Sequence, residues 1–134
     1  MRSKWTILLL GFFAYTNARA NPTDKTQSVK NAYILHCAGC HGLNGNGLPE
    51  NGIPDFHESG RFLSSAQGRK YLIQVPGVSQ SSMNNQQVAD VMNWILSHFS
   101  SNSYRPYTEA EVARLRTYKA SDAVSWREQL TSKN

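Results

Sequence analysis

The sequence predicts an all-α fold, and three observations point to it. Apolar residues in its second half recur at the spacing of one helix face, and residues that cap helices precede several such stretches. No stretch alternates apolar and polar residues as the strands of a half-buried sheet do. The chain has 134 residues without an internal repeat, which favours one small domain.

The first predicted helix of this domain ends at two cysteines. Its less polar residues fall at helical spacing: Val29, Ala32, Tyr33 and Cys37. Residues 21–27 are polar and predict a loose tail before it. Residues 42–47 hold three glycines among six residues, so this segment predicts a loop that ends the helix.

A middle helix and a longer core helix follow. Pro49 and Pro54 predict an irregular segment, after which Ser64 or Ser65 caps a helix that ends at residues 75–77. Asn84, with Gln87 three residues later, predicts the start of the next helix. That helix carries one apolar stripe, which we interpret as core: Val88, Val91, Met92, Ile95, Leu96 and Phe99.

The C-terminal residues predict two shorter helices after a break at residues 100–106. Thr108 and Glu111 form a predicted capping box for a helix that reaches Tyr118, and Ser121 caps a last helix through Leu130. Basic and acidic residues alternate here, which is typical of a solvated helix face: Arg114, Arg116, Lys119, Arg127, Glu109, Glu111 and Glu128.

The N-terminus is typical of a cleavable export signal. Arg2 and Lys4 precede an apolar run at residues 5–15, and residues 18–20 have the small-x-small form that predicts cleavage after Ala20. The run is shorter than the roughly 20 residues that a membrane-spanning helix needs, so no stable membrane span is expected. Removing residues 1–20 takes away three basic residues and lowers the net charge from +5 to +2, which gives no electrostatic basis for binding nucleic acid.

The most specific motif is Cys37-Ala38-Gly39-Cys40-His41, whose spacing predicts covalent attachment of a c-type haem. The two thiols add to the two vinyl groups of the porphyrin, and the histidine binds the iron. A thiol redox pair and half of a zinc site are the alternatives. The chain has only two cysteines, and His36, His57 and His98 do not supply the second ligand pair that a structural zinc site requires.

From residue 28 to residue 99, the order of helix, CxxCH, glycine-rich loop, middle helix and amphipathic helix resembles the class I, single-haem cytochromes c. The resemblance implies a small cytochrome c fold at residues 21–103, followed by a helical extension at residues 104–134. It implies that Tyr33 and Trp94 meet where the first and last core helices cross. It also implies that His41 is the proximal iron ligand, oriented by the carbonyl of Pro54, with Pro49 as the alternative.

The sixth iron ligand is where the chain departs from this family pattern. The family supplies a methionine, often followed by proline, in the loop before its last helix. Met83 is the candidate in that region, although Asn84 follows it. His57 or an open sixth position are the alternatives.

The resemblance implies a periplasmic, monomeric electron carrier rather than an enzyme, with one haem c that cycles between Fe(II) and Fe(III). Segments 71–78 and 88–96 look like those of small periplasmic cytochromes that partner dehydrogenases. The implied partners are a dehydrogenase as donor and an oxidase or another cytochrome as acceptor. The alternative is a haem enzyme or a gas-binding module with an open sixth site.

Overall fold

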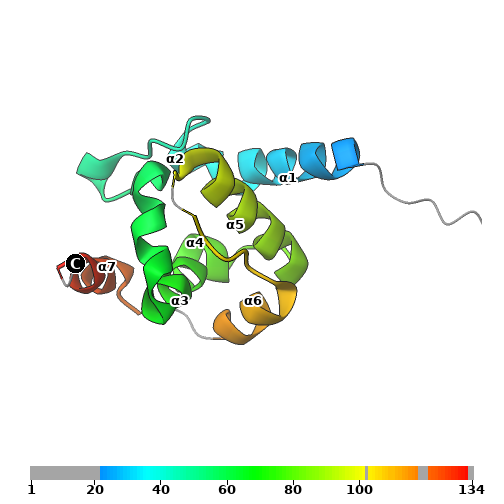
Figure 1. The fold of residues 1–134 in the computed structure, drawn as a ribbon. Coiled ribbons are helices and arrows are strands. Elements are labelled where there is room, and N and C mark those ends of the chain that lie inside the picture. Colours follow the sequence, from blue (N-terminus) through cyan, green and yellow to red (C-terminus); the bar gives the residue numbers. More distant parts are fainter. Residues whose placement is uncertain (1–21, 102, 118–120, 133–134) are drawn as a thin grey trace, which may run out of the picture.

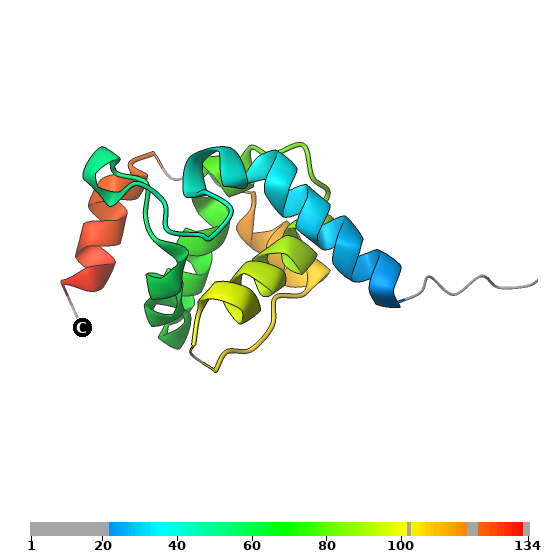
Figure 2. The same cartoon turned by 90° about the horizontal axis from the view of Figure 1, so that it is seen from above.

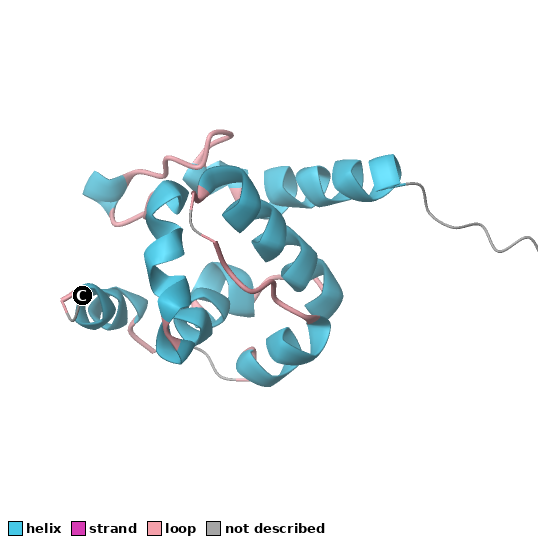
Figure 3. Ribbon diagram, in the orientation of Figure 1, coloured by secondary structure: helices cyan, strands magenta, loops and turns pink. Residues whose placement is uncertain are grey.

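The computed structural model describes residues 22–101, 103–117 and 121–132, and within them it is helical without a strand (Figures 1 and 3). The only pairing of β type there is an isolated bridge between Leu48 and Ile53. This confirms the predicted all-α fold. The helices, with 3-10 helices written η, are α1 Pro22–His36, α2 Ala38–His41, η1 Pro49–Asn51, η2 Phe56–Ser64, α3 Ala66–Gln74, α4 Pro76–Ser79, α5 Asn85–Phe99, α6 Glu109–Leu115 and α7 Ala123–Thr131.

Helix α5 is the centre of the core and begins as predicted. The Asn84 side chain accepts from the backbone N–H of Gln87, and the Gln87 side chain accepts from that of Asn84. Every residue of its apolar stripe is buried. Helix α1 packs across α5 (Figure 2), where the ring of Tyr33 lies 5.0 Å from that of Trp94 and 5.6 Å from that of Phe99. The predicted contact between Tyr33 and Trp94 is therefore present.

Helix α1 starts earlier than the sequence indicated. The prediction of a loose tail is wrong for residues 22–27, which form the first turns of α1, while Asn21 lies outside the described residues. Pro22 suits a first helical turn because proline lacks a backbone N–H, and an N–H at that position has no partner within the helix. Lys25 also pairs with Asp90 on α5 at 3.2 Å. The segment is polar on nearly all sides, so apolar periodicity could not reveal it.

The middle segment has more regular structure than its prolines indicated. The irregular segment contains η1 and η2, while Ser65 caps α3 by accepting from the N–H of Gly68, as one of the two predicted caps. Helix α3 ends at Gln74, and Pro76 starts the short α4. The glycine-rich segment 42–47 is a loop, as predicted.

Of the predicted caps of the C-terminal helices, Thr108 is confirmed without its capping box, and Ser121 is wrong. Thr108 accepts from the N–H of Glu111, but the Glu111 carboxylate pairs with Arg69 and Arg105 instead of closing a capping box. The cap of α7 is Asp122, which accepts from the N–H of Ser125, rather than Ser121. The predicted continuation of α6 to Tyr118 lies outside the described residues.

The interpretation of residues 109–128 as a solvated face is wrong for two of its charged residues. Glu111 is buried. The Arg116 guanidinium donates to the carbonyl of Ser79 at the end of α4, at 3.1 Å, and to the carbonyls of Ser81 and Met83 in the loop that follows, the latter at 2.5 Å. These partners lie more than 30 residues away along the chain, so local charge patterning could not find them.

Among the described residues, no helix is long and apolar enough to cross a membrane. The predicted export signal at residues 1–20 falls outside the described part of the chain.

Candidate haem site

The CxxCH motif lies at the junction between α1 and α2. Cys37 lies directly before α2, and its backbone N–H donates to the carbonyl of Tyr33 at 2.9 Å, so the buried Tyr33 on α1 fixes the start of the motif. Both cysteines are free thiols; Cys37 is partly buried and Cys40 is exposed. Burial raises the pKa of the Cys37 thiol to about 11, which keeps this thiol protonated at neutral pH.

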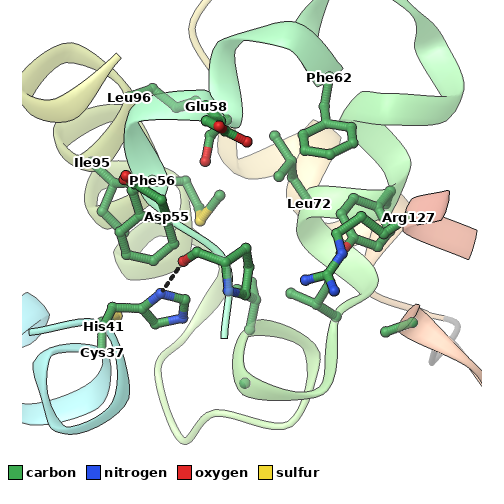
Figure 4. A pocket seen from close by; sticks show the side chains of 18 of the residues that line it. Cys37, His41, Asp55, Phe56, Glu58, Phe62, Leu72, Ile95, Leu96 and Arg127 are labelled. Atoms are coloured by element: carbon green, nitrogen blue, oxygen red, sulfur yellow. Dashed lines mark hydrogen bonds between the residues drawn. The ribbon is translucent and has the colours of Figure 1, made fainter. Parts of the chain in front are cut away.

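His41 is held in one orientation by the carbonyl of Pro54. Its Nδ1 lies 3.1 Å from that oxygen, and because a carbonyl only accepts, Nδ1 carries the proton. The imidazole also stacks on the ring of Phe56 with a centroid separation of 3.9 Å. Figure 4 shows this hydrogen bond, with the other ring nitrogen turned toward a cavity. Burial lowers the pKa of His41, against the effect of the bond to Pro54, and so favours the neutral form that binds metals.

The glycine-rich loop brings Pro54 to His41. Tyr33 donates its hydroxyl to the carbonyl of Gly42 at 2.5 Å, and the N–H of Gly47 donates to the carbonyl of His41 at 3.0 Å. Gly47 has φ +63°, and a Cβ on it would lie 2.5 Å from the carbonyl oxygen of Pro54. The loop thus uses the missing side chain of Gly47 to pass against the residue that orients the histidine.

We expect Gly47→Ala to destabilise the protein more than Gly52→Ala does. Both positions have positive φ, so both alanines carry a backbone cost of about 1 kcal/mol, but only the alanine at Gly47 meets a neighbouring backbone atom. Urea denaturation of the two haem-loaded variants measures the difference. Equal free energies of unfolding would contradict the close approach.

The cavity that His41 faces is mostly apolar. Helices η2, α3, α4 and α5 supply its apolar walls, including Phe62, Leu72, Val75, Val78, Ile95 and Leu96. Cys37 and Pro54 line it beside the histidine, and α7 closes one side with Ala123, Val124 and Arg127. Charge alternation predicts a solvated face for α7, and no local pattern indicates that this helix lines the cavity.

Neither predicted sixth ligand lies among the residues that line the cavity. Met83 is buried outside that lining, with its carbonyl bonded to Arg116. The Nδ1 of His57 pairs with Asp55 at 2.6 Å, and its ring lies edge-on to Phe99. Met92, a predicted core residue, is buried and also lines the cavity. His36 is partly buried and lines the cavity as well.

These residues fit a c-type haem. A neutral imidazole nitrogen faces an apolar space, a thiol lies on its wall, and the second thiol of the motif is accessible beside it. Val124 lines the same space although 51% of it is exposed, and a porphyrin would cover such a side chain.

Comparison with known proteins supports the same group. No family model and no solved structure matches the chain. Two curated proteins do, both named cytochrome c-552 and both from Thermus thermophilus. Each is 29% identical over 105 residues, which cover 62% of this chain and 80% and 71% of theirs. With the CxxCH motif and the all-α fold, these relatives support the identification of the chain as a c-type cytochrome.

Proposed function

We propose that the protein is an electron carrier with one haem c, attached through Cys37 and Cys40 and bound at its iron by His41. When bound, the haem supplies a one-electron couple between Fe(II) and Fe(III). The observation that carries the proposal is the orientation of His41, whose Nδ1 is fixed by Pro54 while its other nitrogen faces the apolar cavity. The two cytochromes c-552 support the same class of protein.

The chain's own part in this function is to hold and shield the cofactor. The bond from His41 to Pro54 fixes the imidazole and makes it a stronger donor toward a metal. The apolar walls from η2, α3 and α5 exclude water, which sets the reduction potential together with the axial ligands. The protein needs no acid, base or nucleophile of its own for this reaction.

Location and partners extend the proposal. The export signal predicted at residues 1–20 supports a periplasmic location, where a dehydrogenase would donate electrons and an oxidase or another cytochrome would accept them. Such encounters use small, short-lived interfaces, so we expect a monomer that forms no tight complex with its partners.

A second function, as a haem enzyme or gas-binding module, depends on the sixth position of the iron. Met83 remains the predicted ligand on the family pattern, with His57 or an open site as the alternatives. Neither Met83 nor His57 lies in the cavity lining, whereas Met92 on α5 does, so the second function requires that Met92 also leaves the iron free. An open site would bind carbon monoxide or nitric oxide directly.

The optical spectrum of the exported protein separates these functions. A low-spin ferric spectrum with a weak band at ~700 nm, and a reduced spectrum that does not respond to carbon monoxide, indicate methionine ligation and an electron carrier. In that case we expect Met83→Leu to abolish the band and Met92→Leu to preserve it. Loss of the band only in Met92→Leu would move the ligand to α5, and a high-spin spectrum that shifts with carbon monoxide would favour the second function.

A further inference from the structure

We propose that α7 is part of the haem site and that Arg127 binds a carboxylate of the haem. This inference rests on the proposed function, because it requires a haem in the cavity. The proposal gives a role to α7, which follows residues 28–99, the part of the chain that resembles the class I cytochromes c.

Helix α7 is fixed against the wall of the cavity rather than lying free in solvent. It packs on α3 (Figure 1), where the ring of Trp126 meets that of Tyr71 edge-on at 5.5 Å, and the Lys70 ammonium lies 5.9 Å from the Trp126 ring centroid. The Arg127 guanidinium donates to the carbonyl of Gly52 at 3.2 Å, across 75 residues of sequence. These contacts tie α7 both to the helix that forms the wall and to the loop that precedes Pro54.

Arg127 contributes a positive charge to the cavity without a carboxylate partner among the described residues. Figure 4 shows its guanidinium turned toward the cavity, on the side away from His41. The other charged groups of the lining are already paired: Arg61 binds Glu58, and Asp55 binds His57. In the described structure the Arg127 guanidinium donates one hydrogen bond, to the carbonyl of Gly52, so most of its five donors remain available.

A haem brings two carboxylates into this space. A guanidinium matches a carboxylate with two parallel hydrogen bonds, and such pairs are stronger than neutral ones. Arg127 also lies near Tyr71, another lining residue, whose pKa is raised by burial although the Arg127 charge acts to lower it. Arg127 therefore offsets the negative charge that a haem carboxylate would otherwise place near the iron.

The test compares Arg127→Gln with Arg114→Gln in the haem-loaded protein. Arg114 is exposed on α6 and does not line the cavity, so this control loses the same charge elsewhere. An unpaired carboxylate favours Fe(III), so we expect the equilibrium constant for reduction to fall roughly three- to tenfold in Arg127→Gln and to change little in Arg114→Gln. Arg127→Lys keeps the charge and should recover most of the loss.

A pH titration of the potential identifies the carboxylate. Without the positive charge of Arg127, the pKa of the haem carboxylate rises. The pH range over which the reduction potential changes should therefore move to higher pH in Arg127→Gln and stay in place in Arg114→Gln. The chain's other charged and titratable groups around the cavity, which are common to all variants, are His36, His41, Asp55, Glu58, Arg61 and Tyr71.

Three outcomes would count against the proposal. Equal potentials and pH profiles in the two glutamine variants would overturn the role of Arg127 while leaving the carrier function intact. An unchanged pH profile with weaker binding of azide to the ferric iron would place Arg127 beside an iron-bound ligand instead of a haem carboxylate. A wild-type protein that attaches no haem would overturn the proposed function and this inference together.

Discussion

The double variant Cys37→Ser, Cys40→Ser should carry no covalently attached haem. Each thiol forms one thioether with a vinyl group, and a serine hydroxyl lacks the nucleophilicity of a thiolate. Acid-acetone extraction, which removes only haem that is not covalently bound, should therefore strip the variant completely and leave the wild type coloured. Each single variant should retain one thioether, with an absorption spectrum of the reduced pyridine complex between those of the wild type and free haem.

The matched control for this experiment is Ala38→Ser. It places a serine inside the motif, at the first residue of α2, without removing a thiol. We expect the control to retain its haem through extraction. Haem that stays attached to the double variant would contradict attachment at this motif, and loss from the control would show that extraction reports on the fold rather than on the thioethers.

The parts of the fold that could be predicted from the sequence are those set by local rules. Helix α5 has its cap, its capping box and its apolar stripe within one continuous segment, so pattern alone gave its start and its buried face. The same holds for the loop at residues 42–47, because glycine content is a local property. The resemblance to cytochromes c added the long-range contact between Tyr33 and Trp94, which no local rule contains.

The parts that were missed depend on partners far away in the sequence. Helix α1 begins at Pro22 among polar residues, and its Lys25 pairs with Asp90 on α5. The position of Glu111, three residues after Thr108, predicts a capping box, but its carboxylate binds Arg69, 42 residues earlier in the chain. Rules for caps and charge patterns consider only neighbours within one helix, so they could not predict an ion pair between residues of two different helices.

The candidate site also contains residues that a local motif predicts and residues that only the folded structure brings together. Cys37, Cys40 and His41 follow from a motif of five residues, and the bond to Pro54 from the family pattern. Met92 and Arg127 enter the cavity only because α5 and α7 are folded around it. A buried methionine in an apolar stripe looks the same in sequence whether it packs in the core or faces a cofactor.

Glu111→Gln should destabilise the protein by about 3 kcal/mol or more, because it leaves a buried guanidinium without its counter-charge. The carboxylate of Glu111 binds Arg69 through two hydrogen bonds of 2.9 Å, and only 7% of the Glu111 side chain and 9% of the Arg69 side chain are exposed. Arg69 also donates to the carbonyl of Arg105 at 2.7 Å and lies 4.1 Å from the centroid of the Tyr107 ring. The pair therefore joins α3 to α6, and the bond to Arg105 joins α3 to the segment that leads into α6.

Urea denaturation of the haem-loaded protein at neutral pH measures this loss. The matched control is Glu128→Gln, which removes the same charge from an exposed position on α7 and should change the free energy of unfolding by less than about 0.5 kcal/mol. Replacing both partners by apolar residues, as in Arg69→Met with Glu111→Leu, should recover much of the loss, since no buried charge then remains unpaired. Equal effects of the two glutamine variants would contradict a buried ion pair.

The same ion pair makes stability depend on pH in a defined direction. Burial alone would raise the pKa of Glu111, but the hydrogen bonds and charges of Arg69 and Arg105 outweigh it and lower that pKa in the folded protein. A carboxyl whose pKa is lower in the folded state binds fewer protons there than in the unfolded chain, so its contribution is complete above the unfolded pKa of about 4.3. That contribution is lost as the pH falls through the folded pKa.

The difference in unfolding free energy between wild type and Glu111→Gln should therefore be constant from neutral pH down to about 5 and become smaller below about 4. A difference that persists unchanged in acid would assign the effect of Glu111 to packing rather than to its charge.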